Sequence, residues 1–185
     1  MKIILTAVLL LSILIAYTAP TFYEAYIEHK VLHVARNIAS DIIWARRESI
    51  KSGKNYGVVF IKGENPGYYI FMDRDAKGKF DTTDFISKKE SLNNISSDIK
   101  FSDAFDDKGV VLKDYTYVFN GGAVPAQQLT QGEDSIFLIN KRDEEKGLMD
   151  RMVRIYINKA TNDIKILRVK GKTKNGDVIF TDIAS

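Results

Sequence analysis

Hydrophobic residues fill the start of the chain almost without interruption. The segment 3–19 reads IILTAVLLLSILIAYTA and contains no charged residue. As an α-helix it spans about 25 Å, close to the roughly 30 Å hydrocarbon core of a bilayer. Pro20 follows and removes one backbone hydrogen bond, so we expect the helix to bend there. The segment therefore predicts a membrane-spanning helix.

The next segment, 21–53, keeps the helical period but becomes amphipathic. Its small and apolar positions recur at steps of three and four, which places them on one stripe: Val31, Val34, Ala35, Ile38, Ile42, Ala45 and Ser49. Gly53 is a suitable helix end, with Lys51 near the negative end of the helix dipole. No loop separates the two segments, so we predict one helix from about Ile3 to about Gly53. Its stripe should cover one open face of a sheet.

Beyond Gly53 the hydrophobic period changes to two, which is typical of β-strands. Residues 56–62 and 67–73 flank GENPG, whose Gly and Pro predict a tight hairpin. Short alternating runs predict seven further strands at 84–89, 97–102, 115–120, 135–140, 151–158, 163–171 and 177–183. The predicted fold class is α+β, with a long N-terminal helix packed on an antiparallel sheet or sandwich. The chain divides into a transmembrane stem (1–20), the amphipathic half of the same helix (21–53) and a β-rich head (54–185).

Composition narrows the classes of function. The chain has 185 residues and no cysteine, which excludes disulfides, thiolate nucleophiles and Cys-based zinc sites. A formal charge of +3 is too small to indicate nucleic-acid binding by itself. Neither a Gly-x-Ser-x-Gly elbow nor a phosphate-binding glycine loop occurs. We therefore predict a protein that is not an enzyme and needs no cofactor.

Two sets of residues are candidate metal ligands. Four aspartates in DRDAKGKFDTTD follow the spacing of a calcium-binding loop, namely Asp73, Asp75, Asp81 and Asp84. Gly78 stands where an EF-hand loop has its Gly, but Lys77 replaces a ligand oxygen and the flanks are strands. We expect a solvated connection between strands, with a weak calcium site as the alternative. His29 and His33 lie four apart without a third ligand, and we expect them to be surface residues.

A basic stretch near the C-terminus is a candidate nucleic-acid contact. It consists of Lys165, Arg168, Lys170, Lys172 and Lys174, and other basic residues precede it at Lys141, Arg142, Arg151 and Arg154. Lysines of this kind can hold DNA phosphates. Asp163, Asp177 and Asp182 dilute the charge, and no aromatic residues are interleaved for base stacking. We therefore expect a solvated strand edge protected by lysines, with DNA contact as the alternative.

Several short motifs occur in a fixed order along the chain. They are Ala19–Phe22, Asp41–Ile50, Asp73–Asp81, Tyr117–Gly122, and Val153–Asn158 followed by Thr161 and Asn162. This ordered set resembles the GspH/FimT family of minor pseudopilins and minor type IV pilins. In that family a leader ending in Gly precedes the mature chain, whose fifth residue is a Glu that registers a subunit against its neighbour. Counted back from Pro20, Ile3 stands near that position without a preceding Gly. We expect either that the coding sequence starts further upstream or that this subunit lacks the Glu.

Three interpretations of the apolar start remain. A cleaved secretory signal would have Lys2 as its basic region, but no A-x-A cleavage pattern precedes Pro20. A plain anchor helix explains the apolarity and not the continuity with segment 21–53. We favour a pilin-type stem, because it requires that continuity.

The resemblance implies a structural subunit, foremost a minor pseudopilin of a type II secretion system. Lys2 favours a cytoplasmic N-terminus, with the head in the periplasm and the stem in the bacterial inner membrane. The implied partners are other pilin or pseudopilin subunits, the inner-membrane assembly platform and, before assembly, membrane lipid. Residues expected at the packing contacts of the stem are Ala7, Ala16, Ala19 and Pro20. The alternatives are a minor pilin of a type IV pilus, including one for DNA uptake, and an anchored periplasmic module that binds DNA or a ligand.

Overall fold

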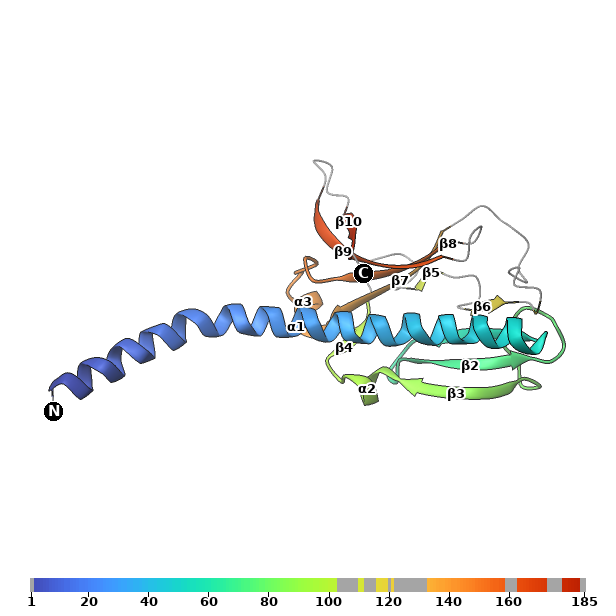
Figure 1. The fold of residues 1–185 in the computed structure, drawn as a ribbon, viewed down its shortest axis with the longest axis horizontal. Coiled ribbons are helices and arrows are strands. Elements are labelled where there is room, and N and C mark those ends of the chain that lie inside the picture. Colours follow the sequence, from blue (N-terminus) through green and yellow to red (C-terminus); the bar gives the residue numbers. More distant parts are fainter. Residues whose placement is uncertain are drawn as a thin grey trace.

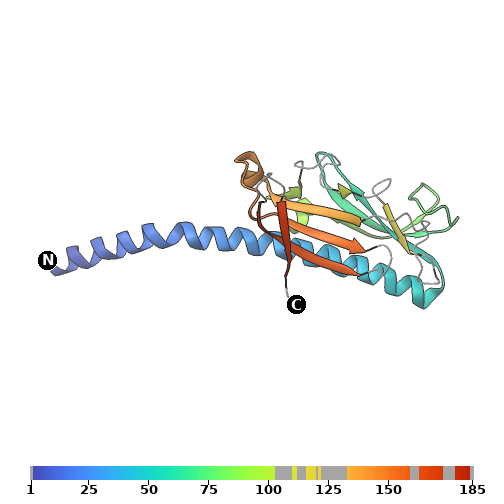
Figure 2. The same ribbon diagram turned by 90° about the horizontal axis from the view of Figure 1, so that it is seen from above.

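One helix, α1 (Lys2–Ser52), forms the long axis of the molecule. The computed structural model describes residues 2–102, 110–111, 116–119, 121, 133–158, 163–172 and 178–183. At 1.5 Å per residue the 51-residue helix is about 76 Å long, and its N-terminal half projects beyond the head (Figures 1 and 2). The prediction of one continuous helix is confirmed. The helix runs through Pro20, and its N-terminal half follows a gradual curve instead of a sharp kink (Figure 1).

The helix ends at the expected glycine. Gly53 adopts φ +67°, a left-handed conformation that favours glycine, and its N–H donates to the Ser49 carbonyl at 3.0 Å. Ser49 is fully buried, and its hydroxyl donates to the carbonyls of Lys54 (2.8 Å) and Phe119 (3.0 Å). The last turn of α1 is therefore fixed to the first residues of the head.

The described strands form two antiparallel sheets. The first sheet has the order β3-β2-β1-β6, with β1 (Asn55–Ile61), β2 (Gly67–Asp73), β3 (Phe85–Ser91) and β6 (Thr116–Phe119). The second has the order β10-β9-β8-β7-β4, with β4 (Ile99–Phe101), β7 (Glu133–Asn140), β8 (Val153–Asn158), β9 (Ile164–Lys172) and β10 (Val178–Asp182), and β5 (Val110–Val111) pairs with β7. Each strand predicted from the sequence is present, and its ends agree with the prediction to within two residues. The sequence did not predict β5 or the short helices α2 (Leu92–Ile95) and α3 (Lys141–Glu145).

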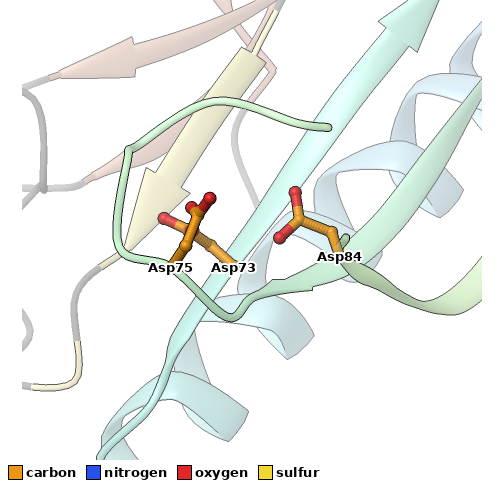
Figure 3. Close-up of side chains that lie close together, drawn as sticks. All are labelled: Asp73, Asp75 and Asp84. Atoms are coloured by element: carbon orange, nitrogen blue, oxygen red, sulfur yellow. The ribbon is translucent and has the colours of Figure 1, made fainter. Parts of the chain in front are cut away.

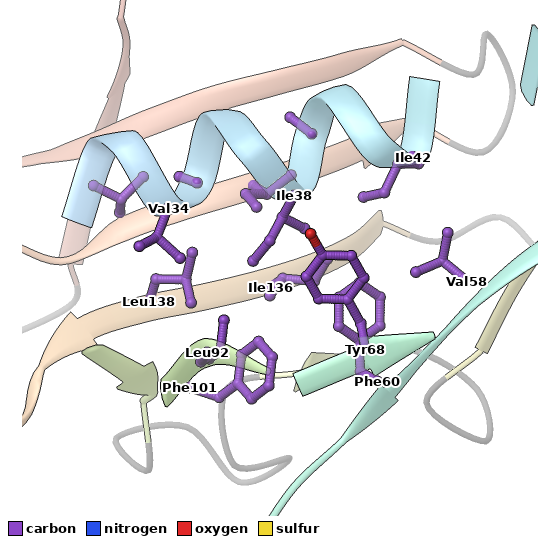
Figure 4. Close-up of a cluster of buried hydrophobic side chains, with 14 of the residues drawn as sticks. Val34, Ile38, Ile42, Val58, Phe60, Tyr68, Leu92, Phe101, Ile136 and Leu138 are labelled. Atoms are coloured by element: carbon purple, nitrogen blue, oxygen red, sulfur yellow. The ribbon is translucent and has the colours of Figure 1, made fainter. Parts of the chain in front are cut away.

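One face of the C-terminal half of α1 packs against both sheets. Its stripe is buried as predicted, with Val34, Ile38, Ile42 and Ala45 at most 1% exposed. The same core cluster contains side chains from both sheets (Figure 4): Val58, Phe60, Tyr68, Ile70, Tyr117 and Phe119 from the first, and Ile99, Phe101, Ile136, Leu138, Val153, Ile155 and Ile157 from the second. The expectation that the helix covers one open sheet face was wrong, because the apolar stripe is wide enough to face both sheets.

A polar contact also fixes the helix to the first sheet. The Tyr68 hydroxyl on β2 donates to Asp41 of α1 at 2.6 Å, and the Lys88 ammonium on β3 contacts the same carboxylate at 2.8 Å. Burial, followed by the hydrogen bond to Asp41, raises the pKa of Tyr68 well above its usual value of about 10. The folded protein therefore keeps this phenol protonated at pH values where the unfolded chain ionises it.

This contact predicts a pH dependence for Tyr68→Phe. At pH 7 the variant should lose about 1–2 kcal/mol of unfolding free energy, because it lacks a buried hydrogen bond. The stabilisation that comes from the raised pKa of Tyr68 is fully present below pH ~10. It declines as the pH rises further, because the phenol loses its proton in the unfolded chain. Phe cannot ionise, so the difference between the two proteins should shrink above pH ~10. Urea unfolding at pH 7, 9 and 11 measures it, and a constant difference would contradict the prediction.

Gly121 packs against the end of the helix. A Cβ atom at this position would clash with the Gly53 carbonyl group. We expect Gly121→Ala to reduce the unfolding free energy by about 2 kcal/mol or more, because the close backbone contact cannot relax without moving the helix end. Gly63→Ala serves as a comparison for backbone strain without a clash, because Gly63 has φ +109° and nothing lies within 4 Å of an added Cβ. An unchanged midpoint of thermal unfolding for Gly121→Ala would contradict the packing argument.

Candidate assembly surface

The N-terminal half of α1 exposes apolar side chains in every direction. Exposed fractions exceed half for all of the large hydrophobic residues described here: Ile4, Val8, Leu9, Leu10, Leu11, Ile13, Leu14 and Ile15. Among the helix side chains that the structure describes, the first buried one is Ile27. A helix that is apolar all round requires cover on every side, by lipid or by other protein. The head supplies none of that cover.

Two polar side chains of the apolar segment hydrogen-bond within the helix. The Ser12 hydroxyl donates to the Val8 carbonyl at 2.6 Å, and the Thr18 hydroxyl donates to the Leu14 carbonyl at 2.9 Å. Neither residue therefore presents an unpaired donor to an apolar medium.

Length and composition make α1 the one helix in the described part of the chain that is able to cross a membrane. A secretory signal meets the same criterion, and so does the core helix of a soluble protein. The apolar window of α1 is entirely exposed, unlike a core helix. The helix also continues without a break into the core of the head, which a cleaved signal does not require.

Aromatic residues mark the end of the exposed apolar half. Phe22, Tyr23 and Tyr26 are 73%, 47% and 58% exposed. The Arg142 guanidinium on α3 lies over the Tyr23 ring at 5.6 Å and donates to its hydroxyl at 3.1 Å. Tyrosine and other amphipathic aromatics favour the boundary between hydrocarbon and water. The position of these rings suits the point where a stem leaves a bilayer.

Polar contacts join the head to the helix from Tyr23 to Glu28. Three head residues contact acidic or phenolic groups of α1: Arg142 with Tyr23, Arg151 with Glu24 (3.3 Å) and Arg168 with Glu28 (3.3 Å). We call this group the collar. The Arg151 side chain is 20% exposed, whereas Glu24, Glu28 and Arg168 are 47–60% exposed. Pairs with an exposed partner contribute little stability alone. Together the three contacts connect the head to one short stretch of α1. The collar was not predicted from the sequence, although Glu24 and Glu28 stand four apart on one helix face.

The small residues of the stem do not form a single stripe. Ala7, Ala16 and Ala19 are all exposed on α1. At about 100° per residue, Ala16 and Ala19 lie roughly 60° apart on one face, whereas Ala7 is roughly 180° from Ala16. Close approach by neighbouring helices is therefore available on two opposite sides. The helix backbone continues through Pro20.

The basic stretch is partly neutralised and is not at a sheet edge. Lys165 pairs with Asp182 at 3.5 Å, Arg168 belongs to the collar, and Lys170 is exposed. The expectation of an edge protected by these lysines was wrong, because β9 lies between β8 and β10 and the edge strand is β10. Only the backbone of Lys172 is described, and Lys174, like the motif residues Asn120, Gly122, Thr161 and Asn162, lies outside the described residues.

The preceding basic residues also have specific partners. Arg151 pairs with the buried Asp143 as well as with Glu24. Arg154 lies over the rings of Phe137, Tyr156 and Phe180 and donates to the Ser135 hydroxyl at 2.8 Å. Because these basic side chains already contact protein groups, they are less available to bind DNA phosphates. This weakens the DNA-contact alternative.

The aspartate loop is a solvated connection at Arg74–Lys77, as the sequence predicts, but it is buried at Asp73 and Gly78. Asp73 is only 4% exposed and Gly78 is buried, because the Gly78 N–H donates to the Asp73 carboxylate at 2.9 Å and folds the loop inward. Asp73, Asp75 and Asp84 form the one cluster of three or more candidate metal ligands in the described residues. Asp81 pairs instead with Lys77 at 3.0 Å. His29 and His33 are exposed on α1, as expected.

No protein-family model matches the chain. Comparison with curated proteins and with solved structures likewise gave no match.

Proposed function

We propose that this chain is a structural subunit of a pilin-type filament, held in a membrane by its stem until it is assembled. The supporting observation is that stem and core belong to one helix. The first half of α1 exposes apolar side chains on all sides, and the second half buries one face against the two sheets of the head. A simple tether needs only a span and a linker. A filament needs each head held in a fixed orientation to its stem, which a continuous helix and the collar provide.

The driving force for assembly follows from the uncovered surface. Lipid covers the stem before assembly, and neighbouring stems replace the lipid afterwards. Because lipid tails are as apolar as leucine, the gain comes from close packing, which the small residues on both sides of the stem permit. Lys2 favours a cytoplasmic N-terminus, so the head would lie on the opposite side, in the periplasm. The role is structural and needs no reactive side chain.

Within this class we propose a minor pseudopilin of a type II secretion system, since the ordered motifs resemble the GspH/FimT family. A minor pilin of a type IV pilus would use the same stem. Deletion of the gene distinguishes the pseudopilin from the pilin. If protein export is lost, the pseudopilin is supported. If surface pili or DNA uptake are lost, the pilin is supported.

Fractionation tests the class as a whole. An epitope tag on the head allows the chain to be followed in sheared filaments and in inner membranes of its native cells. We expect the tagged chain in both fractions, and only in the membrane when the other pilin-type subunits are deleted. A chain that stays in the membrane fraction under all conditions would show that it is a plain anchored protein.

A further inference from the structure

The connection between β2 and β3 gathers three carboxylates inside one loop. Asp73 ends β2, Asp75 follows it, and Asp84 precedes β3. One oxygen from each lies within 4.8 Å of the other two, and Figure 3 shows Asp84 facing Asp73 and Asp75 across the loop. Two oxygens that each lie about 2.3–2.6 Å from the same calcium ion are at most about 5 Å apart. The three oxygens therefore fit around a single ion.

The decisive observation is an unsatisfied oxygen on Asp73. This residue is 4% exposed, and its Oδ2 accepts the Gly78 N–H at 2.9 Å. Its Oδ1 is buried and has no hydrogen-bond partner among the described residues. A carboxylate oxygen removed from water without a partner is costly, and such groups in native proteins call for an explanation. A cation between the three carboxylates would supply the missing interaction.

We propose that Asp73, Asp75 and Asp84 bind a divalent cation, with Ca²⁺ as the preferred ion. All three ligands are hard oxygen donors, which suit Ca²⁺ and Mg²⁺ rather than zinc or copper. Ca²⁺ tolerates irregular geometry, whereas Mg²⁺ requires a near-ideal octahedron. The three aspartates occupy positions 1, 3 and 12 of an EF-hand loop, and Gly78, at position 6, has the left-handed φ of +72° that a sharp turn requires.

Backbone amides hold all three carboxylates in place, Asp73 through the Gly78 N–H already described. Asp84 accepts the N–H of Arg74 at 3.1 Å and of Asp81 at 2.8 Å, and Asp75 accepts the N–H of Lys77 at 3.2 Å. Each carboxylate oxygen has two lone pairs, so these hydrogen bonds leave room for an ion. The loop is therefore organised for binding before the ion arrives.

Lys77 is the cation with which the metal ion competes. Its ammonium pairs with Asp75 and with Asp81. The lysine side chain is 53% exposed. It can therefore move away from Asp75 when a metal ion binds and keep its ion pair with Asp81. Removing this positive charge should strengthen metal binding, since the remaining carboxylates would attract the ion without competition.

Calcium titration of the full chain in detergent tests the site. We expect CaCl₂ at about 5 mM to raise the melting temperature by about 3 °C or more relative to EDTA, and MgCl₂ to raise it less. Isothermal titration should show binding of one ion, at least about tenfold weaker in Asp73→Asn and Asp84→Asn. Asp98→Asn is the matched control, because Asp98 pairs with Lys30 far from the loop. It should bind Ca²⁺ as the unmodified chain does.

Asp73→Asn also has an expected effect without metal. It removes the unsatisfied buried charge, so in EDTA this variant should melt at the same temperature as the unmodified chain or higher. Should either Asn variant fail to fold, Lys77→Gln decides, with an expected affinity for Ca²⁺ several-fold higher than that of the unmodified chain. The proposal would be overturned if the unmodified chain gave no heat of calcium binding. It would also be overturned if the Asn variants bound Ca²⁺ with the same affinity as the unmodified chain. Unchanged or weaker binding by Lys77→Gln would likewise overturn it. The site does not depend on the proposed assembly.

Discussion

We expect Ile42→Asp to lower the unfolding free energy of the head by about 4 kcal/mol or more. Ile42 is fully buried on α1, within the core cluster that both sheets share. An aspartate there would be either a carboxylate without a partner in an apolar core or an acid forced to bind a proton, and both are costly. Because helix and sheets share this cluster, the loss should affect the whole head and not only the helix.

The neighbouring residue provides the control. Ile43 is 37% exposed, so Ile43→Asp introduces the same side chain into the same helix with access to water. The helix propensity of aspartate affects both variants equally. Urea unfolding of the full chain in detergent, followed by circular dichroism, should show a loss below about 1 kcal/mol for Ile43→Asp. Equal midpoints for the two variants would contradict the packing of this face of α1 against the sheets.

The second large effect is expected in the stem. Ala16→Phe should leave membrane insertion intact, because phenylalanine is favourable in a bilayer. It should reduce incorporation into filaments by about tenfold or more, since overpacking of a close helix contact costs about 1–3 kcal/mol. Quantitative blots of sheared filaments and of membranes, from cells that produce equal amounts of protein, measure both effects. Ala7→Phe tests the opposite side of the stem in the same way.

Two control sets separate packing from other roles. Leu9→Phe replaces one large apolar residue by another and should change incorporation much less than Ala16→Phe. Lys170→Ala, Lys172→Ala and Lys174→Ala test the DNA-binding alternative. Loss of function from the lysine changes together with normal function of Ala16→Phe would favour an anchored DNA-binding module. Loss from both sets would favour a minor pilin for DNA uptake.

The sequence predicted those features of the fold that depend on local periodicity. Steps of three and four identified the buried positions Val34, Ile38 and Ile42 before any partner was known. Alternation likewise separated the buried Val153, Ile155 and Ile157 from their half-buried neighbours on β8. In both cases the pattern gives the orientation of each side chain relative to its own element. It does not say which other element covers that side chain.

The hairpin of β1 and β2 was predicted, because its strands are neighbours in the sequence. Features that depend on the placement of elements distant in the sequence were not predicted. One face of the helix contacts both sheets because strands distant in sequence, such as β1 and β8, pack on the same stripe. The collar joins Arg151 and Arg168 to α1 across more than a hundred residues of sequence. The local pattern around Glu24 and Glu28 does not indicate which residues they contact. At Asp73, position and residue type gave opposite predictions. It stands two residues after the buried Phe71, so strand alternation places both side chains on the same buried face. Because aspartate is usually exposed, the sequence instead suggested a solvated side chain.

Photo-cross-linking from the stem tests the assembly proposal most directly. A photo-reactive benzoylphenylalanine at position 9, in place of the exposed Leu9, reports whatever lies against the stem in native cells. The same group at the exposed position 89, in place of Lys89, is the control on the head. Mass spectrometry of the products identifies the neighbours. We predict adducts between the stem and the stems of other pilin-type subunits, reduced in Ala16→Phe. Adducts with lipid alone, in cells that assemble filaments, would contradict a role in filament packing.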